Sequence, residues 1–185
     1  MLKFRKISKM QRIIFLLAAF VCYSCSCDEK TYYLSEGEIA LFPYENTNSI
    51  TFIDNNQNFV VFENIIYERD IYEDNNPSVT FYSGPNCDDS SEEIQVSMSS
   101  SSDYDLFVGT DSGFRATIVD NNIGSFGSYY ELRESEYINN YSFNDVIYDD
   151  VLRLYSEFDN SEIFLIKNIG VVEIHFGSQE FMLNS

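Results

Sequence analysis

Short apolar runs recur along this chain and are separated by clusters of Asn, Asp, Gly and Ser. Runs of five to eight residues that are rich in Tyr, Phe, Ile and Val are typical of strands. The chain has 14 Tyr and 16 Phe but no Trp, and Ala is scarce. The runs do not alternate with helical patterns, which favours antiparallel pairing over βαβ units. We therefore predict an all-β, single-domain antiparallel meander, either a curved barrel-like sheet or a two-layer sandwich.

Three segments predict β-hairpins, because in each of them two apolar runs flank residues that tolerate turn geometry. These segments are 49–67, 104–119 and 163–176, with turns at 54–57, 110–113 and 168–170, and a last short run follows at 180–183. Since side chains alternate along a strand, we expect Val172, Ile174 and Phe176 to point inward. Glu173 and His175 are then expected on the outward face.

Two further segments admit more than one interpretation. Residues 142–155 carry apolar side chains at helical spacing after Ser142, but Asn144-Asp145 also suits a tight turn between two strands. We favour strands, because the neighbouring segments are patterned as strands. The polar run from Ser97 to Asp103 is an edge strand or a loop, and we interpret it as a loop.

The N-terminus has the pattern of an export signal. Five Lys and Arg residues and no acidic residue precede nine continuous apolar residues, Ile13 to Val21. This run is well short of the roughly 20 residues that span a bilayer, so it suits a signal peptide. A short transmembrane anchor is the alternative.

Charge is distributed very unevenly along the chain. All 30 acidic residues lie at Asp28 or later, together with only six Lys and Arg residues, so this part carries a net charge of −24. Such a surface repels nucleic acid and anionic lipid head groups, so we expect no nucleic-acid partner. The charge is interpreted mainly as a means of keeping an exported domain soluble.

The start of the chain resembles the export signal of Bacteroidota-type outer-membrane lipoproteins, in its Lys-rich start, its short apolar run and the sequence SCSCDE at 24–29. The resemblance implies that a cysteine after the apolar run is acylated with a fatty acid such as palmitate, which places the protein at the outer membrane. Acidic residues directly after that cysteine, here Asp28 and Glu29, are associated in this family with display on the outer surface.

The same resemblance ranks the cysteines, because lipoprotein processing requires a small residue before the acylated cysteine. Ser24 precedes Cys25 and Ser26 precedes Cys27, whereas Cys22 follows the bulky Val21. Cys25 is therefore the expected lipidation site, Cys27 is the alternative and Cys22 ranks third. In this family Leu usually stands three residues before the acylated cysteine, where this chain has Cys22.

The fourth cysteine, Cys87, lies far along the chain. If Cys25 is acylated, Cys27 is a candidate for a disulfide with Cys87 in an oxidising compartment; an unpaired Cys87 is the favoured alternative. These assignments divide the chain into a signal peptide (1–24), a lipidated tether (25–36) and a β-rich domain (37–185).

The C-terminal fifth of the chain carries a second, looser resemblance. Residues 148–184 are similar to the ending of small Bacteroidota-type lipoproteins of unassigned function: an aromatic-x-Asp-Val step, a Gly-Val hairpin and a short closing strand. The matching positions are Tyr148, Asp150, Val151, Gly170, Val171 and Leu183, and Phe181-Met182 replaces the usual closing aromatic. This resemblance implies a β-rich lipoprotein and no activity.

Catalytic and metal-binding patterns are weak in this sequence. The single histidine, His175, is expected to be a solvated strand residue, and we assign no catalytic residue. His175 and Cys87 alone do not make a zinc site, and no cofactor is expected. The segment from Asp54 places oxygen-bearing side chains like an EF-hand, but Phe59 stands at the required glycine and Ile65 at the required glutamate. We interpret that segment as a hairpin turn.

These observations favour a lipid-anchored, non-enzymatic binding or structural module of the cell envelope, whose partner is an envelope protein or a glycan. Two alternatives remain: a glycan hydrolase that uses a carboxylate pair, and a carrier that holds an apolar ligand on a concave sheet. Neither alternative has a residue pair in the sequence that singles it out.

Overall fold

The structure, a computed structural model, describes residues 31–73, 90–100, 103–110, 113–122 and 128–184. The chain divides into two units. The larger unit, residues 32–72 and 91–185, holds nearly all of the described residues. In the smaller unit the described residues are Thr31, Glu73 and Ser90, and the hydroxyls of Thr31 and Ser90 lie 2.9 Å apart.

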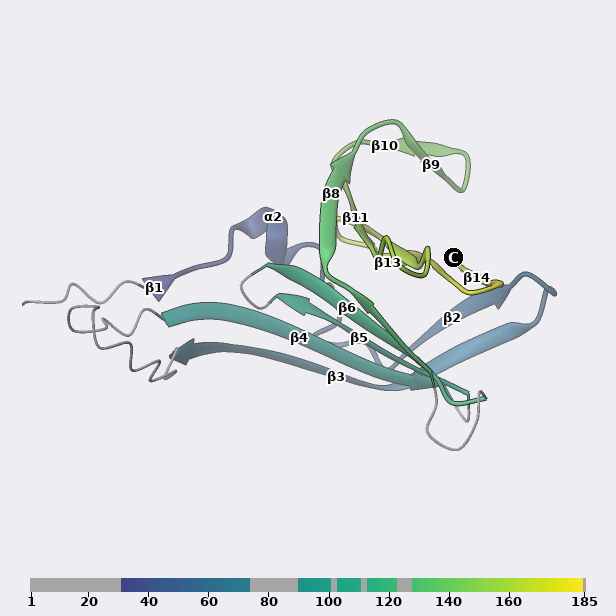
Figure 1. Ribbon diagram of the computed structural model, residues 1–185. Helices are drawn as coiled ribbons and strands as arrows, with labels where there is room; N and C mark the ends of the chain where they lie inside the picture. Colours follow the sequence, from purple (N-terminus) through teal and green to yellow (C-terminus); the bar gives the residue numbers. More distant parts are fainter. Residues whose placement is uncertain (1–30, 74–89, 101–102, 111–112, 123–127, 185) are drawn as a thin grey trace, which may run out of the picture. The chain divides into compact units, whose positions relative to one another are not determined.

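The fold is all-β, which confirms the prediction of a curved, barrel-like antiparallel sheet: twelve strands form one sheet that is nearly closed into a barrel (Figure 1). The sheet order is β7-β6-β5-β4-β3-β2-β14-β13-β12-β11-β8, with β1 paired to β4. The strands are β1 (Thr31–Tyr32), β2 (Ser49–Asp54), β3 (Phe59–Glu73), β4 (Ser90–Ser100), β5 (Tyr104–Thr110), β6 (Phe114–Asp120), β7 (Ser128–Leu132), β8 (Glu134–Ile138), β11 (Val151–Tyr155), β12 (Glu162–Ile166), β13 (Gly170–Phe176) and β14 (Gln179–Leu183). The two edge strands β7 and β8 are consecutive and are separated by Arg133 alone.

A short helix, α2 (Glu36–Ile39), follows β1 and begins with a capping box. The Ser35 hydroxyl accepts a hydrogen bond from the backbone N–H of Glu38, and the Glu38 carboxylate accepts one from the N–H of Ser35. This reciprocal pair satisfies two of the N–H groups that a helix start leaves open. Residues 31–36, the described part of the expected tether, therefore form β1, the cap and the first residue of α2.

The predicted turn at Asn144-Asp145 is confirmed. Asn144 and Asp145 have φ angles of 48° and 62° and join β9 (Tyr141–Phe143) to β10 (Val146–Tyr148), which pair as a separate hairpin. Asn and Asp adopt this left-handed backbone more readily than most residues. Residues 142–155 are therefore strands and turns, and the helical alternative is wrong.

The larger core lies inside the sheet. Buried side chains from the inner faces of the strands fill it, joined by three residues that follow α2. Its buried members are Leu41, Phe42, Tyr44, Phe52, Phe62, Ile94, Val96, Met98, Leu106, Val108, Ala116, Ile118, Leu132, Leu152, Leu154, Ile163, Leu165, Val171, Ile174, Phe176 and Phe181. Burial of this much apolar surface is the main stabilising contribution to the fold.

A second, smaller core lies on the outer face of β11, β12 and β13. Phe143 of the β9–β10 hairpin packs there with Val151, Phe164, Ile166 and Val172. The hairpin lies beside these strands in Figure 1. These three strands are thus covered on both faces, which explains their nearly continuous apolar sequences.

Val172 was expected to point inward with Ile174 and Phe176, and this prediction is wrong. A β-bulge shifts the register, so that Leu165 faces Val171 and Phe164 faces Glu173. Val172 is the extra residue, and it packs in the outer core. A bulge breaks the alternation of faces on which the prediction rested.

The loop predicted from Ser97 to Asp103 is also wrong over its first half. β4 continues to Ser100, with Met98 opposite Leu106 and Ser99 opposite Asp105. Met98 is buried, and Ser97 and Ser99 on either side of it occupy the alternating positions that face away from the core. The polar residues that suggested a loop are therefore largely the outward-facing residues of a strand.

Candidate functional site

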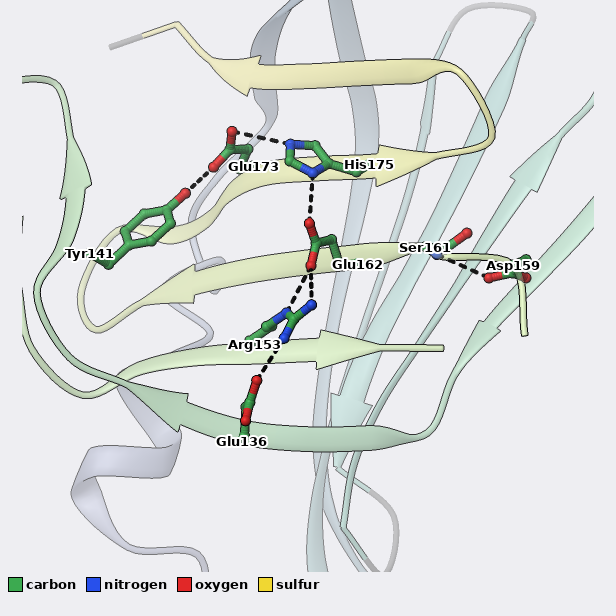
Figure 2. A network of polar contacts seen from close by, with 8 residues as sticks. All are labelled: Glu136, Tyr141, Arg153, Asp159, Ser161, Glu162, Glu173 and His175. Atoms are coloured by element: carbon green, nitrogen blue, oxygen red, sulfur yellow. Dashed lines mark hydrogen bonds and ion pairs between the residues drawn. The ribbon is translucent and has the colours of Figure 1, made fainter. Parts of the chain in front are cut away.

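A line of charged side chains crosses the outer face of four strands (Figure 2). It runs from Glu136 on β8 through Arg153 on β11 and Glu162 on β12 to His175 and Glu173 on β13. Arg153 donates one hydrogen bond to Glu136 and one to Glu162, and each has a length of 2.7 Å. Acidic and basic groups alternate along the line, so each charge has an opposite neighbour.

His175 lies between two carboxylates. Its Nδ1 is 2.9 Å from Glu162 Oε1, and its Nε2 is 3.1 Å from Glu173 Oε1. The bond to Glu173, partly opposed by burial and assisted by Glu162, raises the pKa of His175 to about 9. The ring is therefore a charged imidazolium near neutral pH, with both N–H groups donating.

Tyr141 extends the line to the β9–β10 hairpin. Its hydroxyl donates to Glu173 Oε2, and its ring stacks on Phe164 with the ring centroids 5.0 Å apart. Burial, together with the bond to Glu173, raises the pKa of Tyr141. Glu173 has a lowered pKa, chiefly because it accepts from His175.

The contacts of this network are those of a structural network that links strands, and they do not suit a catalytic site. Both ring nitrogens of His175 already face a carboxylate, so the ring has no free nitrogen with which to accept a proton from a substrate. His175 was predicted to be solvated; instead only 26% of its side chain is exposed and it is held by two partners. That prediction is wrong, because it could not include Glu162, which lies 13 residues away in sequence and directly opposite His175 in the sheet.

A second candidate site is a hollow on the outer face of β3 to β6, with a volume of about 340 Å³. Two rows of residues across the strands define it. One row is Ser97, Phe107 and Thr117, and the next is Gln95, Gly109 and Arg115. Ile66 and Glu68 of β3 complete the rim.

Gly109 creates this hollow, because it places no side chain beside the Phe107 ring. Its own reason for being glycine lies in the sheet: a Cβ at this position would overlap the carbonyl oxygen of Ile94 on β4. Phe107 is 47% exposed, and its ring lines the hollow. No sequence pattern indicates this site, because a glycine inside a strand pattern predicts only a weak strand position.

The acidic turn at Asp54 is a hairpin turn, as predicted. Its carboxylate accepts from the backbone N–H groups of Asn56 and Asn58, at 2.9 and 2.7 Å, and from the Asn58 side chain. These bonds, that from the Asn58 side chain foremost, lower the pKa of Asp54. The described residues contain no group of three or more His, Cys, Asp or Glu side chains that could hold a metal ion.

The residues expected to carry the lipid or a disulfide, Cys22, Cys25, Cys27 and Cys87, lie outside the described residues, as does the expected signal peptide. Within the part of the chain that the structure describes, no helix has the length and apolar character needed to cross a bilayer. Comparison of the chain with known protein families, characterised proteins and solved structures finds no match.

Proposed function

We propose that this protein is a lipid-anchored component of the outer membrane whose β domain binds a small neutral glycan in the hollow beside Phe107. The observation that carries the binding role is the arrangement of Ser97, Phe107 and Thr117 in one row next to Gly109. An exposed aromatic ring flanked by hydroxyl and amide groups offers both an apolar face and hydrogen bonds, as ligand sites commonly do.

The charge of the chain argues against an anionic ligand. The part of the chain from Asp28 onward carries a net charge of −24, which disfavours anionic ligands. The volume of about 340 Å³ is at the lower end of the range for ligand sites, so the ligand is small.

Titration with a panel of neutral oligosaccharides, followed by calorimetry, tests the binding role. Phe107→Ala should weaken binding at least tenfold, because it removes the apolar platform of the site. Phe158→Ala is the matched control, since Phe158 is fully exposed in the turn between β11 and β12. Equal affinity of both variants, or no binding by the unaltered protein, would reject this site.

The lipid anchor rests on the apolar run Ile13 to Val21 and on the cysteines that follow it. Cys25→Ala should move the protein from the membrane fraction to the soluble fraction, and the intact mass of the native protein should include the acyl chains. Retention of Cys25→Ala in the membrane would instead point to Cys27 or to an uncleaved anchor.

The geometry favours binding over the two alternatives. A glycan hydrolase needs a carboxyl with a raised pKa as its acid, whereas the three described carboxyls with a shifted pKa, Asp54, Glu92 and Glu173, are all lowered. A carrier needs space inside the sheet, where Phe52, Phe62, Phe176 and other side chains of the larger core are packed.

A further inference from the structure

Exposed tyrosines lie where the described chain begins. Tyr33 is 70% exposed, and Tyr32 is exposed beside it in β1. Both border a shallow hollow together with Glu93, Gly113 and Phe114, next to the start of β6. Tyrosines in such a position combine an apolar ring with a polar hydroxyl, which suits a boundary between water and an apolar phase.

Glu92 holds this segment against the sheet. Its carboxylate accepts a hydrogen bond from the backbone N–H of Leu34, at 3.0 Å, and another from Arg69 Nε on β3, at 2.7 Å. The Glu92 side chain is largely buried, and the bond from Arg69 is the main cause of its lowered pKa. The residue after Tyr33 is therefore tied to both β3 and β4, which fixes where the tyrosines lie on the larger unit.

The end of β3 brings further exposed apolar surface to the same place. Ile71 and Tyr72 are exposed and follow Arg69 by two and three residues along β3. Because Arg69 contacts Glu92, and Glu92 contacts Leu34, all of these residues lie at one end of the larger unit. Since side chains alternate along β3, Ile71 and Tyr72 point to opposite faces of the sheet and surround its end. We call Tyr32, Tyr33, Ile71 and Tyr72, the exposed side chains around this end, the tyrosine surface.

The short segment between the expected acylated Cys25 and Tyr32 limits how far the tyrosine surface can lie from the bilayer. Tyr32 follows the expected acylated Cys25 by seven positions, and a fully extended chain spans about 3.5 Å per residue, or roughly 25 Å in all. A protein held at Cys25 therefore keeps this end of the larger unit within that distance of its bilayer. The acidic Glu36, Glu38 and Asp70 nearby disfavour anionic head groups.

We propose that the tyrosine surface contacts the zwitterionic interface of the membrane in which the acylated cysteine is anchored. This inference rests on the lipid anchor proposed above. Tyr is enriched at such interfaces, where its ring sits at the level of the head groups. The contact orients the domain with the end that carries Glu92 toward the bilayer.

A tryptophan reporter tests this contact, because the chain contains no Trp. The full-length acylated protein carrying Tyr33→Trp is reconstituted into phosphatidylcholine vesicles, with and without brominated acyl chains that quench Trp emission at short range. Tyr129→Trp is the matched control: Tyr129 is 68% exposed and faces Val119, five residues along β6 from Phe114, or roughly 17 Å away. Tyr72→Trp, on β3, is a second reporter.

The emission of Tyr33→Trp and Tyr72→Trp should shift to shorter wavelength, and brominated lipid should quench both at least twofold more than Tyr129→Trp. Equal quenching of all three variants, in protein that carries the acyl mass and floats with the vesicles, overturns the membrane contact alone. Protein that lacks the acyl mass or does not float overturns the lipid anchor and this inference with it.

Discussion

At the scale of single residues, Tyr44 and Gly170 form one interlocking contact. The Tyr44 hydroxyl accepts a hydrogen bond from the backbone N–H of Val171 at 2.6 Å, inside the larger core. Gly170 has a φ of 88°, and a Cβ there would overlap the Tyr44 hydroxyl. The glycine is thus required both by its backbone conformation and by the close approach of the ring.

Tyr44→Phe should lower the free energy of unfolding by about 1–3 kcal/mol, because it leaves the buried N–H of Val171 without a partner. Urea unfolding at constant pH measures this loss. Tyr129→Phe, at an exposed position, is the control and should change stability by less than about 0.5 kcal/mol. An unchanged midpoint for Tyr44→Phe would show that the buried bond contributes little.

His175 should make stability depend on pH. Its pKa is raised in the folded protein from 6.5 to about 9, so the stabilisation is complete below pH 6.5 and is lost as pH rises through 9. Glu173 acts in the opposite sense: its pKa is lowered from 4.5, so its contribution is present above pH 4.5 and is lost as pH falls. The two residues together therefore stabilise the folded protein most between pH 4.5 and pH 6.5.

Urea unfolding at pH 6 and pH 9 measures the effect of His175. The free energy of unfolding should fall by about 1–3 kcal/mol over this interval, since the histidine is only partly screened by solvent. His175→Gln should remove most of the difference while keeping a polar side chain between the two glutamates. If His175→Gln showed the same pH dependence as the original protein, His175 would not be the group responsible for it.

At the scale of elements, the β9–β10 hairpin depends on a two-residue turn with positive φ at both positions. Asp145 has a φ of 62°, which costs an ordinary L-residue about 1–2 kcal/mol. Asp145→Gly should therefore be more stable than Asp145→Ala by about 1 kcal/mol, because glycine accepts this conformation freely. Thermal unfolding of the two variants measures the difference, and a more stable alanine variant would contradict the turn geometry.

Local signals explain which elements could be predicted. The turns at Asp54, Asn144-Asp145 and Asn168 were found because Asn, Asp and Gly mark positive φ, and Asn144, Asp145 and Asn168 adopt it. The bulge at Val172 could not be found, since nothing in its own sequence distinguishes it from a regular strand position. The network at His175 was predicted only in part. Strand alternation correctly placed Glu173 and His175 on the outward face, but the third member, Glu162, comes from the neighbouring strand β12 and was not predicted.

At the scale of the whole molecule, the pairing of β2 with β14 joins segments more than 120 residues apart, such as Phe52 opposite Leu183. Consecutive strands pair from β2 to β7 and from β11 to β14, so this contact joins the two runs into one sheet. Sequence patterns identify strands but carry little information on which distant strands are neighbours. Such long-range pairing also predicts slow folding, because a large loop must close before the contact forms.

The last strand should therefore be essential to the fold, and Phe181 is the position that tests it. Phe181 is buried, lies 5.1 Å from the Tyr104 ring centroid and stacks on Phe176 at 5.5 Å. Phe181→Ala should lower the free energy of unfolding by about 3–5 kcal/mol, through lost burial and the cavity left behind.

The adjacent Met182 gives a matched control in the same strand, because its side chain points to the opposite face and is exposed. Met182→Ala should cost less than about 1 kcal/mol in denaturant unfolding, since it removes little buried surface and leaves the ladder to β2 and β13 intact. If both variants lost the same stability, backbone pairing of β14 and not its inner face would hold the two runs of strands together. A large loss confined to Phe181→Ala means that the aromatic contacts across the interior join the first and last parts of the chain.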